Sequence, residues 1–196
     1  MKRTNRCLFA ALLIAVLALA GCEAGAFRIT PIEPTAAPVH ASPLGSMGDY
    51  RTQSGLFEMD FPAGWSDAAG DDRRCQDAPK CLISRDSEFM LVRELKMVGR
   101  DGAPPSLATE LDAVVANFSG TTADAEFVSR TPFVTLSGLQ GEVLEYRIES
   151  GLVTVKELWA AEGNQAVSVA FITWNEGFTA MEPVADYVFG SLARVE

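Results

Sequence analysis

Apolar and polar residues alternate along much of the chain with a period of two, which is the period of a β-strand that buries one face. The segments predicted as strands are residues 57–61, 89–98, 126–136, 144–149, 152–161 and 166–174. Segment 89–98 is apolar on much of both faces, so we expect it near the centre of its sheet. Pro132 lacks the amide hydrogen that a strand ladder needs, which predicts an edge position or a bulge for segment 126–136.

Two further segments have the spacing of an amphipathic helix, in which apolar residues recur every three or four positions. The first has Ser106 as its expected N-cap, Gly120 as its stop, and an apolar stripe of Leu107, Leu111, Val114, Val115 and Phe118. The second has a stripe of Phe178, Met181, Val184, Ala185, Val188 and Leu192. We expect Pro183 in the first turn of this final helix, where its missing amide hydrogen costs nothing. Five or six mostly antiparallel strands covered by two main helices would form an α+β sandwich.

The N-terminal segment has the features of a bacterial lipoprotein signal peptide. Three basic residues precede an uncharged apolar run over residues 8–20, which ends in a lipobox at residues 19–22 (Leu-Ala-Gly-Cys). A helix that spans a bilayer needs roughly 17 to 25 apolar residues, so the run is too short for an uncleaved membrane anchor, the alternative interpretation. We therefore expect residues 1–21 to be removed and the sulfur of Cys22 to carry a diacylglycerol.

The segment that follows, residues 22–52, has no sustained apolar period and contains four prolines among alanine, serine, threonine and glycine. Such a segment buries too little side chain to offset the entropy of ordering it, so we expect a disordered tether. His40, the one histidine of the chain, lies in this tether and is expected to be solvated. The folded domain is expected to span residues 53–196, a usual length for one domain.

The charge of the chain limits its partners. The sequence has 16 basic and 26 acidic residues, a net charge of −10. Three of the basic residues belong to the signal peptide, which leaves thirteen basic against twenty-six acidic residues in the mature chain. Such a charge repels nucleic acid and anionic lipid headgroups, so we expect no nucleic-acid partner. Attachment to the bilayer would come from the acyl chains on Cys22, because two or more chains hold a protein stably.

Cys75 and Cys81 are the cysteines that remain in the expected mature chain besides Cys22. An exported protein meets an oxidising compartment, so we expect these two thiols to form a disulfide that closes a short, exposed loop. A metal site made by the two cysteines and nearby aspartates is the alternative. It lacks histidine and the paired cysteine spacing that zinc sites usually show.

The loop just before Cys75 is strongly charged. Its charged residues are Asp71, Asp72, Arg73 and Arg74. They are a candidate interaction surface, although a charged loop closed by a disulfide is more often a solvated turn.

Three segments of the expected domain form a recognisable set. They are residues 57–65 (Phe-Glu-Met-Asp-Phe-Pro-Ala-Gly-Trp), residues 134–141 (Val-Thr-Leu-Ser-Gly-Leu-Gln-Gly) and the final helix of residues 178–192. With this set the chain resembles the PsbP-like superfamily, which also includes a Ran-binding nuclear import factor and many small bacterial lipoproteins. The resemblance implies an α-β-α sandwich that works by docking to partners, in the photosynthetic case to photosystem II. The lipid anchor and the segment from Cys75 to Cys81 depart from the photosynthetic member, and no binding motif of those proteins is matched.

These features favour a non-catalytic lipoprotein that acts as an accessory or protein-binding module at the cell envelope, with an envelope protein as its partner. The domain lacks histidine, the usual general base, and its serines and carboxylates form no nucleophile-elbow or phosphate-loop pattern. We therefore expect no catalytic residue and no cofactor. The alternative is a carrier of a small ligand or a metal ion, with a pocket between sheet and helix near Trp65, Trp159 and Trp174.

Overall fold

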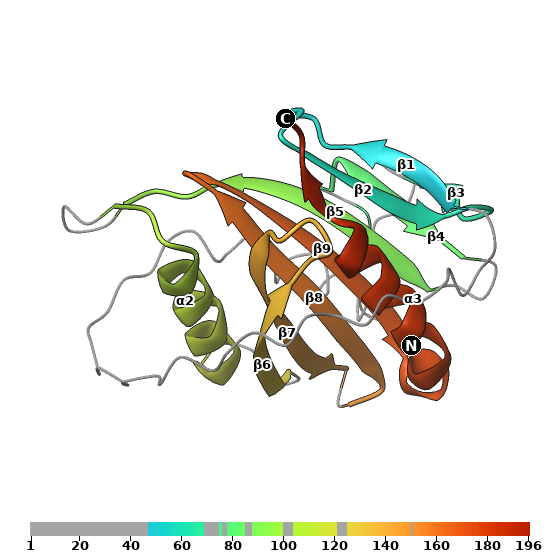
Figure 1. Ribbon diagram of the computed structural model, residues 1–196. Coiled ribbons are helices and arrows are strands. Elements are labelled where there is room, and N and C mark those ends of the chain that lie inside the picture. Colours follow the sequence, from blue (N-terminus) through green and yellow to red (C-terminus); the bar gives the residue numbers. More distant parts are fainter. Residues whose placement is uncertain are drawn as a thin grey trace, which may run out of the picture.

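Two antiparallel sheets and two helices make up the part of the chain that the computed structural model describes. The described residues are 47–68, 75, 78–84, 88–99, 104–120, 125–149 and 151–196. The larger sheet has seven strands and the smaller sheet has three (Figure 1). The fold is therefore α+β, as the sequence predicts, but its strands outnumber the five or six that we expected.

The larger sheet has the strand order β3-β4-β5-β9-β8-β7-β6, and each neighbouring pair is antiparallel. Its strands are β3 (Ser66–Asp67), β4 (Lys80–Ile83), β5 (Phe89–Lys96), β6 (Glu126–Val134), β7 (Gln140–Ile148), β8 (Val153–Glu162) and β9 (Gln165–Trp174). β5 lies inside the sheet, between β4 and β9, which confirms the position predicted from its two apolar faces. β6 is an edge strand whose register shifts between Phe127 and Ser129, so the prediction made from Pro132 is also confirmed.

The smaller sheet brings the two ends of the described chain together. Its strands are β1 (Met47–Arg51), β2 (Phe57–Pro62) and β10 (Ala193–Arg194), with β2 in the middle. β1 falls within the segment that we assigned to the tether, so the boundary placed at residue 53 is too late. This strand has a weak apolar pattern and depends on its pairing with β2, which a local pattern does not reveal. β3 and β10 have two residues each, too few to show a period of two.

The two helices are α2 (Leu107–Gly120) and α3 (Asn175–Ser191). α2 begins where its apolar stripe predicts. Pro183 lies inside α3, so the prediction that it occupies the first turn is wrong. The helix tolerates this proline because Pro183 and Thr179, whose carbonyl loses a hydrogen bond, are both exposed to water. Neither helix of the described chain is both long and apolar enough to cross a bilayer.

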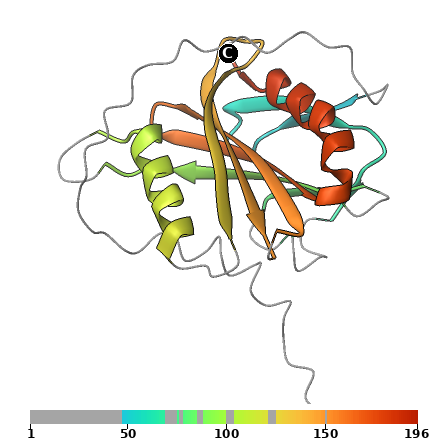
Figure 2. The same cartoon turned by 90° about the horizontal axis from the view of Figure 1, so that it is seen from below.

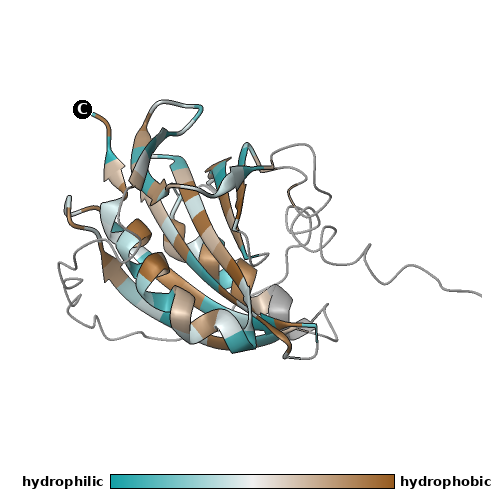
Figure 3. Ribbon diagram, turned by 90° about the vertical axis from the view of Figure 1, so that its right-hand side faces the viewer, coloured by the Kyte–Doolittle hydropathy of each residue, from teal (hydrophilic) through white to brown (hydrophobic). Residues whose placement is uncertain are grey.

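The helices cover opposite faces of the larger sheet, which runs between them in Figure 2. Successive strand residues point to opposite faces, so hydrophobic and hydrophilic bands alternate along the strands (Figure 3). The α3 face carries Val143, Leu158, Val169 and Phe171, and its core also includes Phe57 and Met59 of β2 and Val188 and Phe189 of α3. The α2 face carries Leu91, Leu144, Val155 and Ala170, and its core also includes Leu111 of α2.

Candidate functional site

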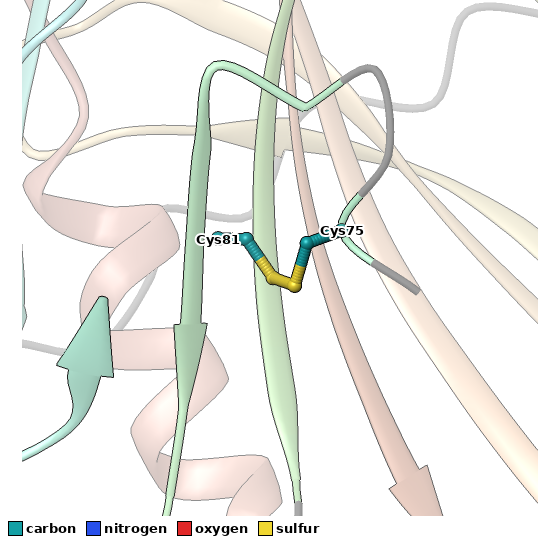
Figure 4. The surroundings of a disulfide bond; sticks show 2 residues. All are labelled: Cys75 and Cys81. Carbon is teal, nitrogen blue, oxygen red and sulfur yellow. A yellow bond between two sulfur atoms is a disulfide. The ribbon is translucent and has the colours of Figure 1, made fainter. Parts of the chain in front are cut away.

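Cys75 and Cys81 form a disulfide, as the sequence predicts (Figure 4). Their Cα atoms are 5.6 Å apart, and Cys81 lies in β4. The exposed fractions are 1% for Cys75 and 0% for Cys81, so the expected position on an exposed loop is wrong. Both cysteines belong to the core of the α2 face, where Cys81 lies opposite Leu91 of β5. The disulfide therefore closes part of a hydrophobic core.

Several residues singled out in the sequence lie outside the described part of the chain. They are Cys22, His40, Asp71, Asp72, Arg73 and Arg74. The metal-site alternative for Cys75 and Cys81 is wrong, because each sulfur is bonded to the other and no thiolate remains to bind a metal. Across the residues that the structure describes, no group of three or more His, Cys, Asp or Glu side chains could hold a metal ion.

The three tryptophans lie at separate places, so the pocket predicted near all three is wrong. Trp65 packs on the α3 face, where the centroids of its ring and that of Phe171 are 6.0 Å apart. Trp159 of β8 packs on the α2 face. Trp174 ends β9 and is 51% exposed. The period of two shows which residues of one strand share a face, but it does not show which face they share with another strand.

An open depression of about 700 Å³ lies at one end of the larger sheet. It is lined by Ser137, Gly138, Leu139, Gln140, Ala161, Glu162, Arg194 and Glu196. None of the three tryptophans is among these lining residues. Nη1 of Arg194 lies 2.7 Å from Oε1 of Glu162, so the only cation of the lining is already paired.

A row of polar side chains crosses three neighbouring strands on the α2 face. Arg93 of β5 lies in register with Ser168 of β9, which lies in register with Trp159 of β8. Arg93 is 9% exposed and Ser168 is fully buried. Within the described structure, Nε of Arg93, Oγ of Ser168 and Nε1 of Trp159 have no hydrogen-bond partner. Each of these atoms carries a hydrogen, so the row offers donors to any acceptor that reaches it.

A buried pair, Tyr146 and Glu157, lies on the same face. The Tyr146 hydroxyl donates a hydrogen bond to Oε2 of Glu157 over 3.1 Å. Burial, followed by the charge and hydrogen bond of Glu157, raises the pKa of Tyr146 well above its usual range, and the charge of Arg93 acts in the opposite direction. Sequence reasoning did not identify this group. The available signal was Arg93 itself, a charged residue on the side of its strand that carries Leu91 and Leu95.

Arg130 links the edge strand β6 to α2. Its Nε and Nη2 both donate to the carboxylate of Glu142 in β7, the second over 2.9 Å. Its Nη1 donates to Oδ1 of Asp112 in α2 over 2.5 Å. These contacts, above all the hydrogen bond to Glu142, raise the pKa of Arg130 despite its partial burial. The guanidinium is therefore used to fix the helix to the sheet.

Comparison with known proteins identifies the fold. No protein-family model matches the chain, and no curated protein matches it. Among solved structures, the chain is similar to cyanobacterial PsbP (CyanoP) from Synechocystis sp. PCC 6803. The identity is 15% and the TM-score 0.55, and the alignment covers 83% of this chain and 99% of that one.

Two further solved structures are similar. One is LpqN, involved in cell envelope biogenesis of Mycobacterium tuberculosis, at 11% identity and a TM-score of 0.54 over 77% of this chain and 91% of that one. The other is the Saccharomyces cerevisiae Ran-binding protein Mog1p, at 11% identity and a TM-score of 0.49 over 77% and 96%. The first two likenesses show that the fold is PsbP-like, which confirms the resemblance stated from the sequence.

Proposed function

We propose that the chain is an exported bacterial lipoprotein, anchored by acyl chains on Cys22, that acts without catalysis as an accessory or protein-binding module of the cell envelope. The observation that carries the proposal is the Cys75–Cys81 disulfide, because structural disulfides persist in exported proteins and are rare in the cytosol. With these two cysteines paired, Cys22 is the one thiol left after removal of residues 1–21.

On this proposal, residues 22–46 tether the domain to the membrane. A flexible segment of this length reaches roughly 30 Å, enough to hold the domain clear of the lipid surface. The high negative charge of the chain favours the same arrangement, since it keeps the domain away from anionic headgroups.

A solved structure of similar fold supports a role at the cell envelope. LpqN, which has a similar fold, is involved in cell envelope biogenesis. The one histidine of the chain, His40, lies in the proposed tether, so the domain lacks the side chain that most often serves as a general base.

Fractionation of cells that express the full chain tests the anchor. We expect the wild-type chain in the membrane fraction and Cys22→Ala in the soluble fraction. Cys7→Ala is the matched control, because this cysteine lies in the segment that is removed and its loss should change nothing. A Cys22→Ala chain that stays in the membrane would reject lipidation as the anchor.

Crosslinking in isolated envelopes that contain the lipidated chain tests the binding role, and a reproducible protein adduct is expected. The same experiment tests the charged loop as the contact. Its residues Asp71, Asp72, Arg73 and Arg74 are replaced by Asn, Asn, Gln and Gln. Loss of the adduct would assign the contact to this loop, and an unchanged adduct would reject it.

A second function, the carriage of a small ligand, is favoured by the unpaired donors of Arg93, Ser168 and Trp159. Unsatisfied buried donors are uncommon and call for an acceptor, which is either ordered water or a ligand. Native mass spectrometry of the full chain purified from its host distinguishes a bound ligand from ordered water. A carrier retains an additional mass that is lost in Ser168→Ala but kept in the control Ser137→Ala. A bare chain mass would reject the carrier.

A further inference from the structure

The turn between β7 and β8 contains a residue in a backbone conformation that its residue type rarely adopts. Glu149 has a φ of 53°, in the left-handed region, and it is the only residue other than glycine with a positive φ in the described chain. Glycine and asparagine adopt this conformation at little cost, whereas glutamate loses stability there. Its side chain is exposed, so no burial offsets this loss.

The junction between β9 and α3 departs from the usual chemistry in the same way. Trp174 occupies the N-cap position of α3 and makes no side-chain hydrogen bond to the helix. Serine, threonine, aspartate and asparagine stabilise this position, and tryptophan does not. Trp174 is 51% exposed and belongs to neither hydrophobic core.

These two places lie side by side at one end of the larger sheet. The amide of Asn175 donates to the carbonyl of Leu152 over 3.1 Å, and its side-chain amide donates to the carbonyl of Gly151. The hydroxyl of Thr154 donates to Oδ1 of Asn175 over 2.5 Å. The turn is therefore fixed to the start of α3. Leu152, which is 61% exposed, lies in this turn just before β8, whose first residue, Val153, is in register with Trp174.

The surroundings of this exposed apolar pair are acidic. Glu149 and Glu176 are both exposed. The nearby ion pairs join Arg147 to Glu126 and Lys156 to Glu182 and Asp186, and within the described chain they leave Glu149 and Glu176 without an ion-pair partner. The end of the sheet thus presents two large apolar side chains beside two unpaired carboxylates.

We propose that Glu149, Leu152 and Trp174 form an anchor that docks into an apolar pocket, bordered by lysine, on a partner protein. Residues that lower stability and make no compensating contact are concentrated at functional sites. Tryptophan is enriched among the few residues that carry most of the energy of an interface. The inference rests on the protein-binding function proposed above and names the surface that performs it.

A partner protein fits this surface better than a membrane does. The carboxylates of Glu149 and Glu176 are repelled by the anionic surface of a cytoplasmic or bacterial leaflet. Two apolar side chains, one in the turn between β7 and β8 and one at the end of β9, match a pocket of protein dimensions, and the carboxylates of Glu149 and Glu176 select a partner of opposite charge.

A carbodiimide tests the anchor directly, because it condenses a carboxylate with a lysine amine in contact with it into an amide, with formal loss of water. In isolated envelopes with the lipidated wild-type chain, mass spectrometry should find Glu149 or Glu176 joined to a partner lysine that lies beside apolar residues. Trp174→Ser should lower this adduct at least tenfold. Leu136→Ser, the matched control, removes a 57% exposed leucine in another turn of the sheet and should leave the adduct within twofold.

Thermal unfolding of the same variants excludes a merely structural role. Trp174→Ser supplies a capping hydroxyl, and Glu149→Asn removes the charge while keeping a residue that tolerates the backbone. We expect each variant to match the wild-type Tm or exceed it by about 2 to 4 °C, although each yields less adduct. A lowered Tm that accompanies the loss of adduct would overturn the proposal.

The remaining outcomes separate the anchor from the wider function. Protein adducts that form through other carboxylates and survive Trp174→Ser would overturn the anchor and leave the binding function intact. An absence of any protein adduct would overturn both. Flotation of the soluble Cys22→Ala chain with phosphatidylcholine vesicles, abolished by Trp174→Ser, would overturn the protein anchor in favour of a lipid surface.

Discussion

The two faces of the larger sheet are stabilised in different ways. On the α3 face, α3 and the smaller sheet bury an apolar core in which the rings of Phe133, Phe171 and Phe189 pack edge to face. Among the described residues, the core of the α2 face has fewer large apolar side chains and combines them with a disulfide and with the buried groups of Arg93 and Glu157. One face depends on hydrophobic burial, and the other depends more on a covalent bond and polar contacts.

This difference predicts where the domain opens first. Regions with few buried apolar contacts unfold locally at a lower free energy than the main core does. The α2 face also contains donors without partners, each of which costs free energy when it is buried. We therefore expect the α3 face to set the free energy of global unfolding. The α2 face should unfold locally at a lower free energy.

Phe189→Ala on the α3 face should have the largest effect. Phe189 is fully buried, and its ring centroid lies 5.8 Å from that of Phe171. Loss of a buried phenylalanine costs about 3 to 5 kcal/mol, whereas Leu111→Ala, fully buried on the α2 face, should fall near the lower end of its range, at about 2 kcal/mol. Urea unfolding measures both changes. A larger loss for Leu111→Ala would reverse the proposed order of the two faces.

The α3 face is also the one that the sequence describes better. Its helical stripe and the alternation of Phe57 and Met59 are regular, because both elements bury one continuous apolar side. The sequence did not reveal β1 or β10, since both strands depend on pairing with β2. β1 pairs with it as a hairpin of weak apolar pattern, and β10 pairs with it from the far end of the chain. Pro183 misled the prediction of the helix start, because a proline is tolerated inside a helix when it and the carbonyl four residues before it, here that of Thr179, face water.

The α2 face could be predicted only in part. Compartment chemistry gave the pairing of Cys75 and Cys81 correctly, but not its burial, because a polar loop in the sequence gives no sign of what covers it. The charged residues Arg93 and Glu157 occupy inward positions that a polarity pattern assigns to apolar residues. The tryptophan pocket failed because the faces of separate strands are matched only by the fold.

Removal of the disulfide should affect the α2 face selectively. For a closed loop of about seven residues, the chain-entropy relation gives roughly 2.3 kcal/mol of stabilisation. We expect the double variant Cys75→Ala and Cys81→Ala to lose about that much in urea unfolding. In hydrogen exchange, the amides of β4 and β5 should lose protection while those of α3 keep theirs. Equal loss on both faces would show that the sheet opens as one unit.

Arg130→Lys tests the polar contacts of the α2 face at a smaller scale. Lysine keeps the charge but cannot form the two parallel hydrogen bonds to Glu142 and also reach Asp112. The Arg130 side chain is 15% exposed, so we expect a loss of about 1 kcal/mol. Arg194→Lys is the matched control. Its pair with Glu162 is exposed, and its change should stay within about 0.5 kcal/mol. Similar losses for the two variants would show that the Arg130 contacts stabilise the domain no more than an exposed ion pair does.

Alkaline pH should produce the smallest effect, and it acts on both faces. On the α2 face, burial and then Glu157 raise the pKa of Tyr146, so the unfolded chain releases this proton first and stability falls as pH rises past the ordinary tyrosine value of about 10. On the α3 face, desolvation of Lys156 is outweighed by its bonds to Asp186 and Glu182, so its pKa is raised and its contribution is also lost at high pH.

Tyr146→Phe separates these two contributions. Near pH 10.5, loss of the phenolic proton from the unfolded chain should cost the wild type about 0.8 kcal/mol relative to neutral pH, in addition to the change from Lys156. The variant leaves Glu157 without its donor, a loss that does not depend on alkaline pH, and it retains only the change from Lys156. Urea unfolding at neutral pH and near pH 10.5 measures how far the free energy of unfolding falls between the two pH values in each chain. An equal fall in the free energy of unfolding for the two chains would contradict a raised pKa of Tyr146 in the folded protein.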